Sequence, residues 1–226
     1  MSIAQRLVEV QEQLAVAAAR SGREPSDIEL LVVSKNFTAD RVREVVDTGQ
    51  RAFGENRVQE ALEKQPLLPQ DMEWHLIGPL QRNKVRKVVG KFACLQGIDS
   101  LKLAQAVARV AEEQGIRQSI LLQVKIGEEE TKSGFATETL LESIEELVQL
   151  RSLQIEGLMT IPPPVSHPDE AKPFFVAARE LRDRLVRVSG LPLSQLSMGM
   201  SGDFQAAIAE GSTMVRIGSA IFGKRS

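Results

Sequence analysis

The chain begins with an apolar stripe at helical spacing and then alternates between two patterns of hydrophobic positions. Ile3, Leu7, Val10, Leu14 and Ala17 recur at steps of three and four residues, which predicts an amphipathic N-terminal helix. Beyond it, short apolar runs typical of buried strands are followed by stretches with helical periodicity. Eight such runs occur, at Ile28–Ser34, Arg51–Gly54, Glu73–Gly78, Phe92–Ile98, Ser119–Ile126, Gln154–Ile161, Gln195–Met200 and Thr213–Gly218.

This alternation predicts a parallel sheet, because parallel neighbours are joined by a crossover that is usually a helix. Eight strand–helix units are the number that closes a TIM-type barrel, and an open doubly wound sheet is the competing arrangement. Glycines that suit left-handed helix ends follow several helical stretches, at Gly49, Gly90, Gly115, Gly190 and Gly211. We therefore expect an α/β fold, a single (β/α)8 TIM-type barrel with an extra N-terminal helix, that forms one domain over residues 1–226.

The amino-acid composition limits the kinds of binding partner and the cellular compartment that we expect. The 226 residues carry a formal net charge of −2 with both signs interspersed, which argues against nucleic acid or an anionic membrane as the main partner. The single cysteine, Cys94, excludes an intrachain disulfide and fits a reducing compartment. The sequence has no signal-peptide core and no apolar run long enough to span a bilayer, so we expect a cytoplasmic protein.

Lys35 closes the first predicted strand, at the barrel end where active sites collect. Partial burial there disfavours the charged ammonium, which lowers the pKa of a lysine and makes it a better nucleophile toward an aldehyde. The alternative is a lysine whose stem is buried and whose amine reaches solvent, and Lys35 taken alone favours that alternative.

The ends of the seventh and eighth strands carry the residue types that hold phosphate. Ser201, Gly202 and the pair Gly218–Ser219 offer hydroxyls and unobstructed N–H groups, and a short helix after Gly218 would point its N-terminus at the same place. Ordinary turn chemistry explains these residues equally well.

Arg216 lies between two apolar residues in the eighth predicted strand. A permanent charge inside a barrel needs an acceptor, which a pyridine nitrogen, a carboxylate ligand or an internal acidic side chain could supply. Together with Lys35 and the phosphate-binding residue types, Arg216 describes one ligand that has an aldehyde, a phosphate and a ring acceptor.

Motifs at most of the strand ends extend this pattern over nearly the whole chain. They are Val32–Lys35, Phe53–Asn56, His75–Gly78 with Gln81–Lys84, Gly157–Thr160, Leu196–Asp203 and Val215–Gly218. These motifs resemble the pyridoxal 5′-phosphate (PLP) homeostasis protein family, which is related to the N-terminal barrel of bacterial alanine racemase. The resemblance implies a barrel that holds PLP as an internal aldimine on Lys35, with Ser201, Gly218 and Ser219 at the phosphate.

The resemblance also assigns roles around the ring of the cofactor. It implies that Arg216 faces the pyridine nitrogen and that Asn56 and Met159 line the ring. Lys132, in the segment Thr131–Gly134, matches a lysine that is proposed to take part in PLP transfer. One departure is visible, because residues 36–38 read Asn-Phe-Thr where many relatives have Thr-Lys-Pro, which removes a second lysine just beyond the first strand.

The implied function is that of a PLP carrier or buffer in vitamin B6 and amino-acid or keto-acid homeostasis, without catalysis. Its partners would be PLP and either apo-enzymes that use PLP or a regulatory protein, and we expect a monomer. A guanidinium beside the pyridine nitrogen disfavours ring protonation, which weakens the electron sink that decarboxylases and transaminases use. The alternative is a PLP-dependent amino-acid racemase, which needs a proton donor or acceptor on each face of the cofactor. The chain has no tyrosine to serve there, and Cys94 and His75 are expected in the core or the pocket wall.

Other classes of protein fit the sequence poorly. Two histidines far apart and one cysteine do not form a metal site, so we expect no metal. Gly199–Asp203 lacks the second glycine of a serine-hydrolase elbow, and no dinucleotide fingerprint follows the first strand. The basic stretch Arg82–Lys87 is either a partner surface or a solvated helix face, and the valines within and beside it favour the solvated face.

Overall fold

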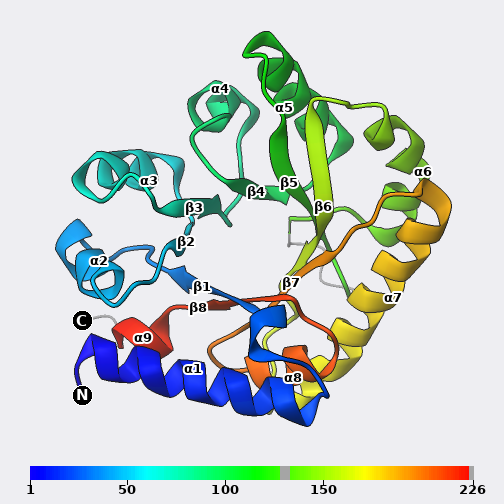
Figure 1. Ribbon diagram of the computed structural model, residues 1–226. Coiled ribbons are helices and arrows are strands. Elements are labelled where there is room, and N and C mark those ends of the chain that lie inside the picture. The colour runs from blue at the N-terminus through cyan, green and yellow to red at the C-terminus, as the bar shows by residue number, and fades with distance from the viewer. Residues whose placement is uncertain (128–132, 224–226) are drawn as a thin grey trace.

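The computed structural model describes residues 1–127 and 133–223, and within these ranges eight parallel strands close into a barrel. The strands follow one another in chain order, and β8 pairs with β1 to complete the ring (Figure 1). This closure confirms the TIM-type barrel and excludes the open doubly wound sheet. The strands are β1 (Glu29–Val33), β2 (Ala52–Glu55), β3 (Glu73–Leu76), β4 (Cys94–Ile98), β5 (Gln118–Val124), β6 (Leu153–Thr160), β7 (Gln195–Met200) and β8 (Met214–Ile217).

Helices surround the barrel and cover the outer faces of its strands (Figure 1). The five glycines expected at helix ends all adopt positive φ, and Gly190 ends the longest crossover helix at φ 71°. The α-helices are α1 (Ile3–Arg20), α2 (Ala39–Val46), α3 (Val58–Lys64), α4 (Val85–Val88), α5 (Leu101–Glu113), α6 (Thr137–Val148), α7 (Lys172–Ser189), α8 (Phe204–Ala209) and α9 (Ser219–Phe222). Four short 3-10 helices lie in the described ranges, at Pro25–Asp27, Gln65–Leu67, Arg82–Lys84 and Pro168–Ala171.

The N-terminal helix α1 completes the outer layer where β8 meets β1. A capping box begins it, because Ser2 Oγ accepts from Gln5 N at 3.2 Å and the Gln5 side chain accepts from Ser2 N at 2.8 Å. Its predicted apolar stripe is buried, and the helix packs against α2, α8 and α9. Since α9 has only four residues, α1 supplies the apolar face that this side of the barrel needs.

Strand residues alternate between two separate apolar regions, as the pleat of a strand requires. Val32 faces outward into the large core beneath the helices, whereas Leu31 and Val33 face inward and pack with Ile77 and Met214. A second inward group fills the opposite side of the barrel interior, and it consists of Cys94, Leu121 and Met159. The barrel is therefore filled by side chains, and a ligand site can form only above this filling.

The basic stretch Arg82–Lys87 lies on the surface in a short 3-10 helix and the start of α4. Val85, Val88 and Val89 are buried while Arg86 and Lys87 are exposed, as expected for a solvated helix face. Among the described helices, none is both long enough and apolar enough to cross a bilayer.

Gly157 lies where β6 and β7 approach too closely for any side chain. A Cβ at this position would lie 1.8 Å from the carbonyl oxygen of Gln195, which is a backbone atom and cannot move aside. The pairing of Gly157 with Gln195 is thus compatible with glycine alone.

We predict that Gly157→Ala lowers the free energy of unfolding by about 4 kcal/mol or prevents folding, because β6 and β7 must separate. Gly202→Ala is the matched control, since a Cβ there meets nothing within 4 Å and its φ is not positive. Urea denaturation followed by circular dichroism measures both variants. Equal stabilities for the two variants would contradict the assigned β6–β7 register.

Candidate functional site

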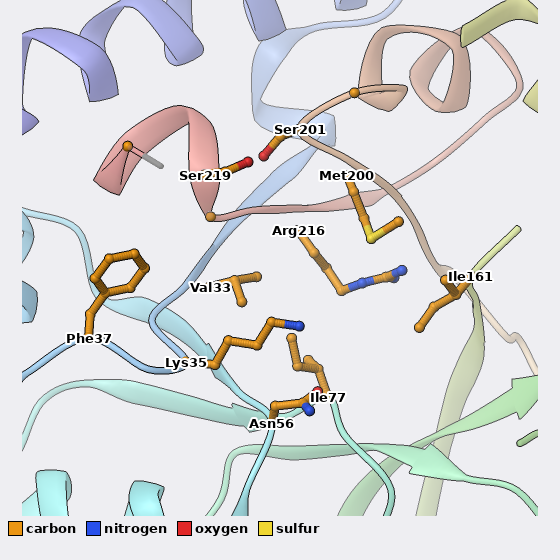
Figure 2. A pocket seen from close by; sticks show the side chains of 13 residues that line it. Val33, Lys35, Phe37, Asn56, Ile77, Ile161, Met200, Ser201, Arg216 and Ser219 are labelled. Carbon is orange, nitrogen blue, oxygen red and sulfur yellow. The ribbon is translucent and has the colours of Figure 1, made fainter. Parts of the chain in front are cut away.

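A cavity of about 520 Å³ opens at the carboxyl ends of the strands, the face on which barrel proteins bind ligands. Its floor is the layer of inward-facing side chains, and its walls come from β1, β7, β8 and the loops that follow the strands (Figure 2). The lining residues are Val33, Lys35, Phe37, Asn56, Ile77, Ile161, Met200, Ser201, Gly202, Arg216, Gly218, Ser219 and Gly223.

Lys35 lies two residues beyond Val33, the last residue of β1, and its side chain extends into this cavity. Val33 and Ser34 are buried, whereas Lys35 itself is half-buried. Figure 2 shows the Lys35 amine between Asn56, Ile77 and the aliphatic part of Arg216. The structure thus places the amine in the cavity and not in bulk solvent.

Arg216 lies on the floor of the cavity and is 3% exposed. Its Nη1 donates to the carbonyl oxygen and the hydroxyl of Ser197, at 2.7 and 2.8 Å, and its Nη2 donates to the Thr160 carbonyl oxygen at 2.9 Å. Burial lowers the pKa of the guanidinium to about 10, while the Asp203 carboxylate acts in the opposite direction. The group therefore stays charged at neutral pH, and neutral oxygen acceptors hold it in place instead of an internal acid.

A directed chain of hydrogen bonds runs from Arg216 through the barrel interior. Because a guanidinium can only donate, the Ser197 hydroxyl accepts from it and donates onward to Gln96 Oε1 at 2.7 Å. Gln96 Nε2 then donates to His75 Nδ1 at 2.9 Å. The chain fixes the neutral His75 ring with its proton on Nε2.

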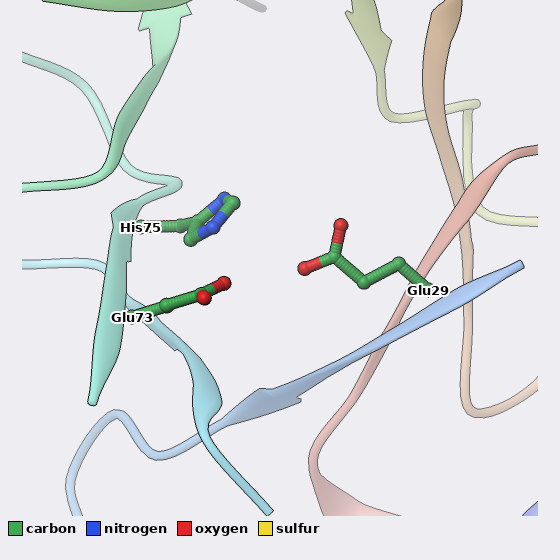
Figure 3. Close-up of side chains that lie close together, drawn as sticks. All are labelled: Glu29, Glu73 and His75. Carbon is green, nitrogen blue, oxygen red and sulfur yellow. The ribbon is translucent and has the colours of Figure 1, made fainter. Parts of the chain in front are cut away.

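Glu29 and Glu73 lie close to His75 at the opposite end of the barrel interior (Figure 3). One ligand-type atom from each of the three residues lies within 4.8 Å of the others. The His75 ring, however, uses its Nδ1 lone pair to accept from Gln96 and carries a proton on Nε2. A metal-binding histidine needs a free lone pair on one nitrogen and a donor on the other, which this hydrogen-bond chain does not provide.

Two serines face each other at the edge of the cavity where β7 and β8 end (Figure 2). Ser201 Oγ accepts from Ala220 N at 3.5 Å, which ties the loop after β7 to the first turn of α9. Asp203 Oδ1 accepts from Met200 N at 2.6 Å and closes that loop. Ser201 and Ser219 thereby present hydroxyls on adjacent segments, and the short helix expected after Gly218 is confirmed as α9.

Six of the eight residues expected at the site line this one cavity, namely Lys35, Asn56, Ser201, Arg216, Gly218 and Ser219. Met159 does not, because it is fully buried and packs with Cys94 and Leu121. Ile161, which lies two residues further along the chain and just past the end of β6, lines the cavity instead. Lys132 lies outside the described residues.

Apolar lining residues are the part of the site that sequence reasoning missed. Phe37 stacks on Phe222 with ring centroids 4.3 Å apart, and this contact joins the loop after β1 to helix α9. Val33 carried a usable signal, because it lies two residues before Lys35 and strand alternation places both side chains on the same face. Strand alternation alone could not place Met200, because the register of β7 against β8 shifts between Ser197 and Met200.

These features define a (β/α)8 barrel with a lysine and a buried arginine at its ligand-binding mouth. Residues 7–226 match the family model described as the alanine racemase N-terminal domain. The chain belongs to this family, and within it to the pyridoxal phosphate homeostasis proteins.

The similar proteins cover almost the whole chain. The pyridoxal phosphate homeostasis protein of Aquifex aeolicus is 42% identical over 226 residues, which are 100% of this chain and 99% of the relative. The protein of that name from Escherichia coli K12 is also 42% identical, with 99% of this chain and 97% of the relative covered.

Solved structures resemble the fold at two levels of similarity. PipY of Synechococcus elongatus PCC7942, solved with PLP bound, is 41% identical with a TM-score of 0.87 and covers 98% of this chain and 100% of its own. Alanine racemase of Clostridium difficile 630 is 19% identical with a TM-score of 0.70, and the match covers 88% of this chain and 53% of the racemase. The second likeness shows the fold alone.

We predict that His75 remains neutral well below the pH at which a histidine ordinarily gains its proton, because burial lowers its pKa to about 4. The unfolded chain, with a histidine pKa of about 6.5, binds a proton more readily than the folded chain. The stability contributed by neutral His75 is therefore complete above pH ~6.5 and is lost as the pH falls toward ~4, by about 3 kcal/mol in total. Imidazole NMR signals titrated from pH 7 to 4 measure this directly.

The exposed His167 is the only other histidine and gives a reference signal in the same spectrum. His75→Gln keeps an oxygen that can accept from Gln96 and should flatten the loss of stability between pH 6.5 and 4. A His75 signal that titrates near pH 6.5 would show that the ring is not buried as described.

Proposed function

We propose that this protein binds PLP in the cavity at the carboxyl ends of its strands and acts in PLP homeostasis as a carrier or buffer. The names of the relatives that it matches over nearly its full length support this function, as does the PLP bound to PipY. The observation that carries the proposal is the convergence of Lys35, Arg216 and the pair Ser201 and Ser219 on one cavity.

The residues at this cavity fit the chemical groups of PLP. The Lys35 amine suits the aldehyde, the two serine hydroxyls and the backbone at Gly218 suit the phosphate, and Arg216 suits the ring nitrogen. The flat ring of the ligand also needs apolar walls. These are supplied by Val33, Ile77, Ile161 and Met200. A volume of about 520 Å³ lies within the range of small-molecule sites.

Lys35 is the residue that would hold the cofactor covalently, as a Schiff base through Nζ. When bound, PLP supplies an aldehyde that reacts with amines and a ring that withdraws electrons. The protein contributes the position of the amine in the cavity, which opens at the carboxyl ends of the strands and so would leave the linkage within reach of an incoming amine.

Arg216 would keep the chemistry of the bound cofactor weak. A guanidinium that stays charged repels a proton on a neighbouring ring nitrogen, and an unprotonated ring is a weaker electron sink. Three hydrogen bonds to Ser197 and Thr160 hold the guanidinium so that it cannot turn away. This arrangement favours storage of PLP over its use in catalysis.

A racemase needs a second proton-transfer residue at the cofactor, and the described residues offer no good candidate. Cys94 lies inside the barrel, where burial raises the pKa of its thiol, and His75 accepts a hydrogen bond from Gln96 beneath the cavity. Neither is among the lining residues. The carrier function is therefore the better supported of the two.

We further propose that residues 1–226 act as one PLP-binding domain, as a monomer in the cytoplasm. Recipients of the cofactor would be apo-enzymes that use PLP, or a regulatory protein would read the bound state. The interspersed charges of the chain and its net charge of −2 support a partner other than nucleic acid.

We predict that borohydride reduction of the protein with PLP leaves a stable adduct on the peptide that contains Lys35. The adduct should be lost completely in Lys35→Ala, because no amine remains at that point of the cavity. Peptide mass spectrometry after reduction measures the site and the extent of labelling.

Lys35→Arg is the matched control, since a guanidinium keeps the positive charge but does not form a Schiff base. It should show no adduct while keeping the fold. Labelling of a different lysine in the wild-type protein, or an unmodified Lys35 in excess PLP, would contradict the proposal.

A further inference from the structure

A buried cluster of charged side chains lies directly behind Lys35, on the outer side of β1 and β2. Lys64 Nζ, near the end of α3, lies 2.8 Å from Glu55 Oε1 and 2.6 Å from Glu60 Oε1. It also donates to the carbonyl oxygen of Ser34 at 2.9 Å. The side chains of Lys64 and Glu55 are 8% and 0% exposed, so this is an interior cluster and not a surface ion pair.

Each acid of the cluster holds the residue on one side of Lys35. Glu55 Oε1 accepts from the Ser34 hydroxyl at 2.7 Å, and Lys64 binds the Ser34 carbonyl oxygen. Glu60 Oε1 accepts from the backbone N–H of Asn36 at 2.5 Å. The backbone is therefore fixed immediately before and immediately after Lys35.

Asn36 adopts φ +64°, in the left-handed region that side-chain-bearing residues rarely occupy. This conformation turns the chain sharply away from the line of β1, just after Lys35. The charge-assisted bond from Asn36 N–H to Glu60 stabilises the turn. The turn is also closed by Phe37 N–H, which donates to the Ser34 carbonyl oxygen at 3.1 Å, so Glu60 supports a turn that encloses Lys35.

The cluster is a costly way to stabilise a fold. Burying charges removes their hydration, and apolar residues of similar size often stabilise a protein as well or better. Glu55 has one oxygen, Oε2, with no hydrogen-bond partner among the described residues, and burial raises the pKa of its carboxyl. Such a cluster is more readily explained by what it holds than by the stability it adds.

We propose that Glu55, Lys64 and Glu60 are positioning residues that fix the backbone on both sides of Lys35 and so aim its amine into the cavity. This inference rests on the proposed function, since it concerns how Lys35 is presented to PLP. The inference also predicts that Lys64, a buried lysine nearby, does not react with PLP in place of Lys35. The three N–H groups of its ammonium are directed at Ser34, Glu55 and Glu60.

Four variants, with changes in α3 and in Glu55 of β2, are compared with wild type by the rate at which bound PLP is released to excess apo-enzyme. Glu60→Ala removes the acceptor of Asn36 N–H and should accelerate release about tenfold, as expected when one charge-assisted hydrogen bond is lost. It should also shift the pH midpoint of the absorbance of the bound cofactor. Glu60→Gln keeps an oxygen acceptor and should lie between wild type and Glu60→Ala.

Glu63→Ala is the matched control, because Glu63 is an exposed acid on the same helix. It should leave both the release rate and the absorbance midpoint unchanged. The double variant Glu55→Gln/Lys64→Met replaces the buried charges with neutral groups of similar size, and it removes the Lys64 contacts to Ser34 and Glu60 while the Glu60 side chain itself is kept. It should stay folded and release PLP faster by a similar factor.

Thermal unfolding of the PLP-free variants separates positioning from a purely structural role. Unchanged release rates and absorbance midpoints in Glu60→Ala and in the double variant would overturn the inference, whatever their melting temperatures. If the wild-type protein forms no adduct on Lys35, the proposed function fails first. If wild type forms the adduct and the variants behave like wild type, only the positioning role fails.

Discussion

A permanently charged guanidinium inside the barrel is the constraint on which the site depends. Arg216 can be buried only because Ser197 and Thr160 present oxygen acceptors to it from the two preceding strands in the chain. The Ser197 hydroxyl must then donate onward, which orients Gln96 and fixes the tautomer of His75. One charge thus orders a row of polar side chains from the cavity floor to the far end of the barrel interior.

The charged residues that line the cavity above that floor, Lys35 and Arg216, come from opposite ends of the chain. The Arg216 charge and the serine hydroxyls come from β7, β8 and their loops, whereas the Lys35 amine comes from β1. β8 and β1 are neighbours only because the barrel closes, with Leu31 opposite Arg216 in the register. Ring closure therefore brings together a nucleophile from the start of the chain and a cation from its end.

Periodicity predicted the elements well and individual contacts poorly. All eight strands lie in the short apolar runs that the sequence shows, and the parallel barrel followed from their number. The family resemblance implied that Met159 lines the PLP ring, whereas Ile161, one residue past the end of β6, lines the cavity. Glu55, Lys64 and Glu60 gave no usable signal, because their contacts with Ser34 and Asn36 depend on how α3 packs against β1 and β2.

Arg216 is proposed to face the ring nitrogen of PLP and to keep it unprotonated. The most direct measurement is the ¹⁵N NMR chemical shift of the pyridine nitrogen in labelled PLP bound to the protein at neutral pH. We expect the shift of a neutral pyridine that accepts a hydrogen bond. The shift of a protonated pyridinium would contradict it, because a second positive charge could not lie against this guanidinium without an acid beside it.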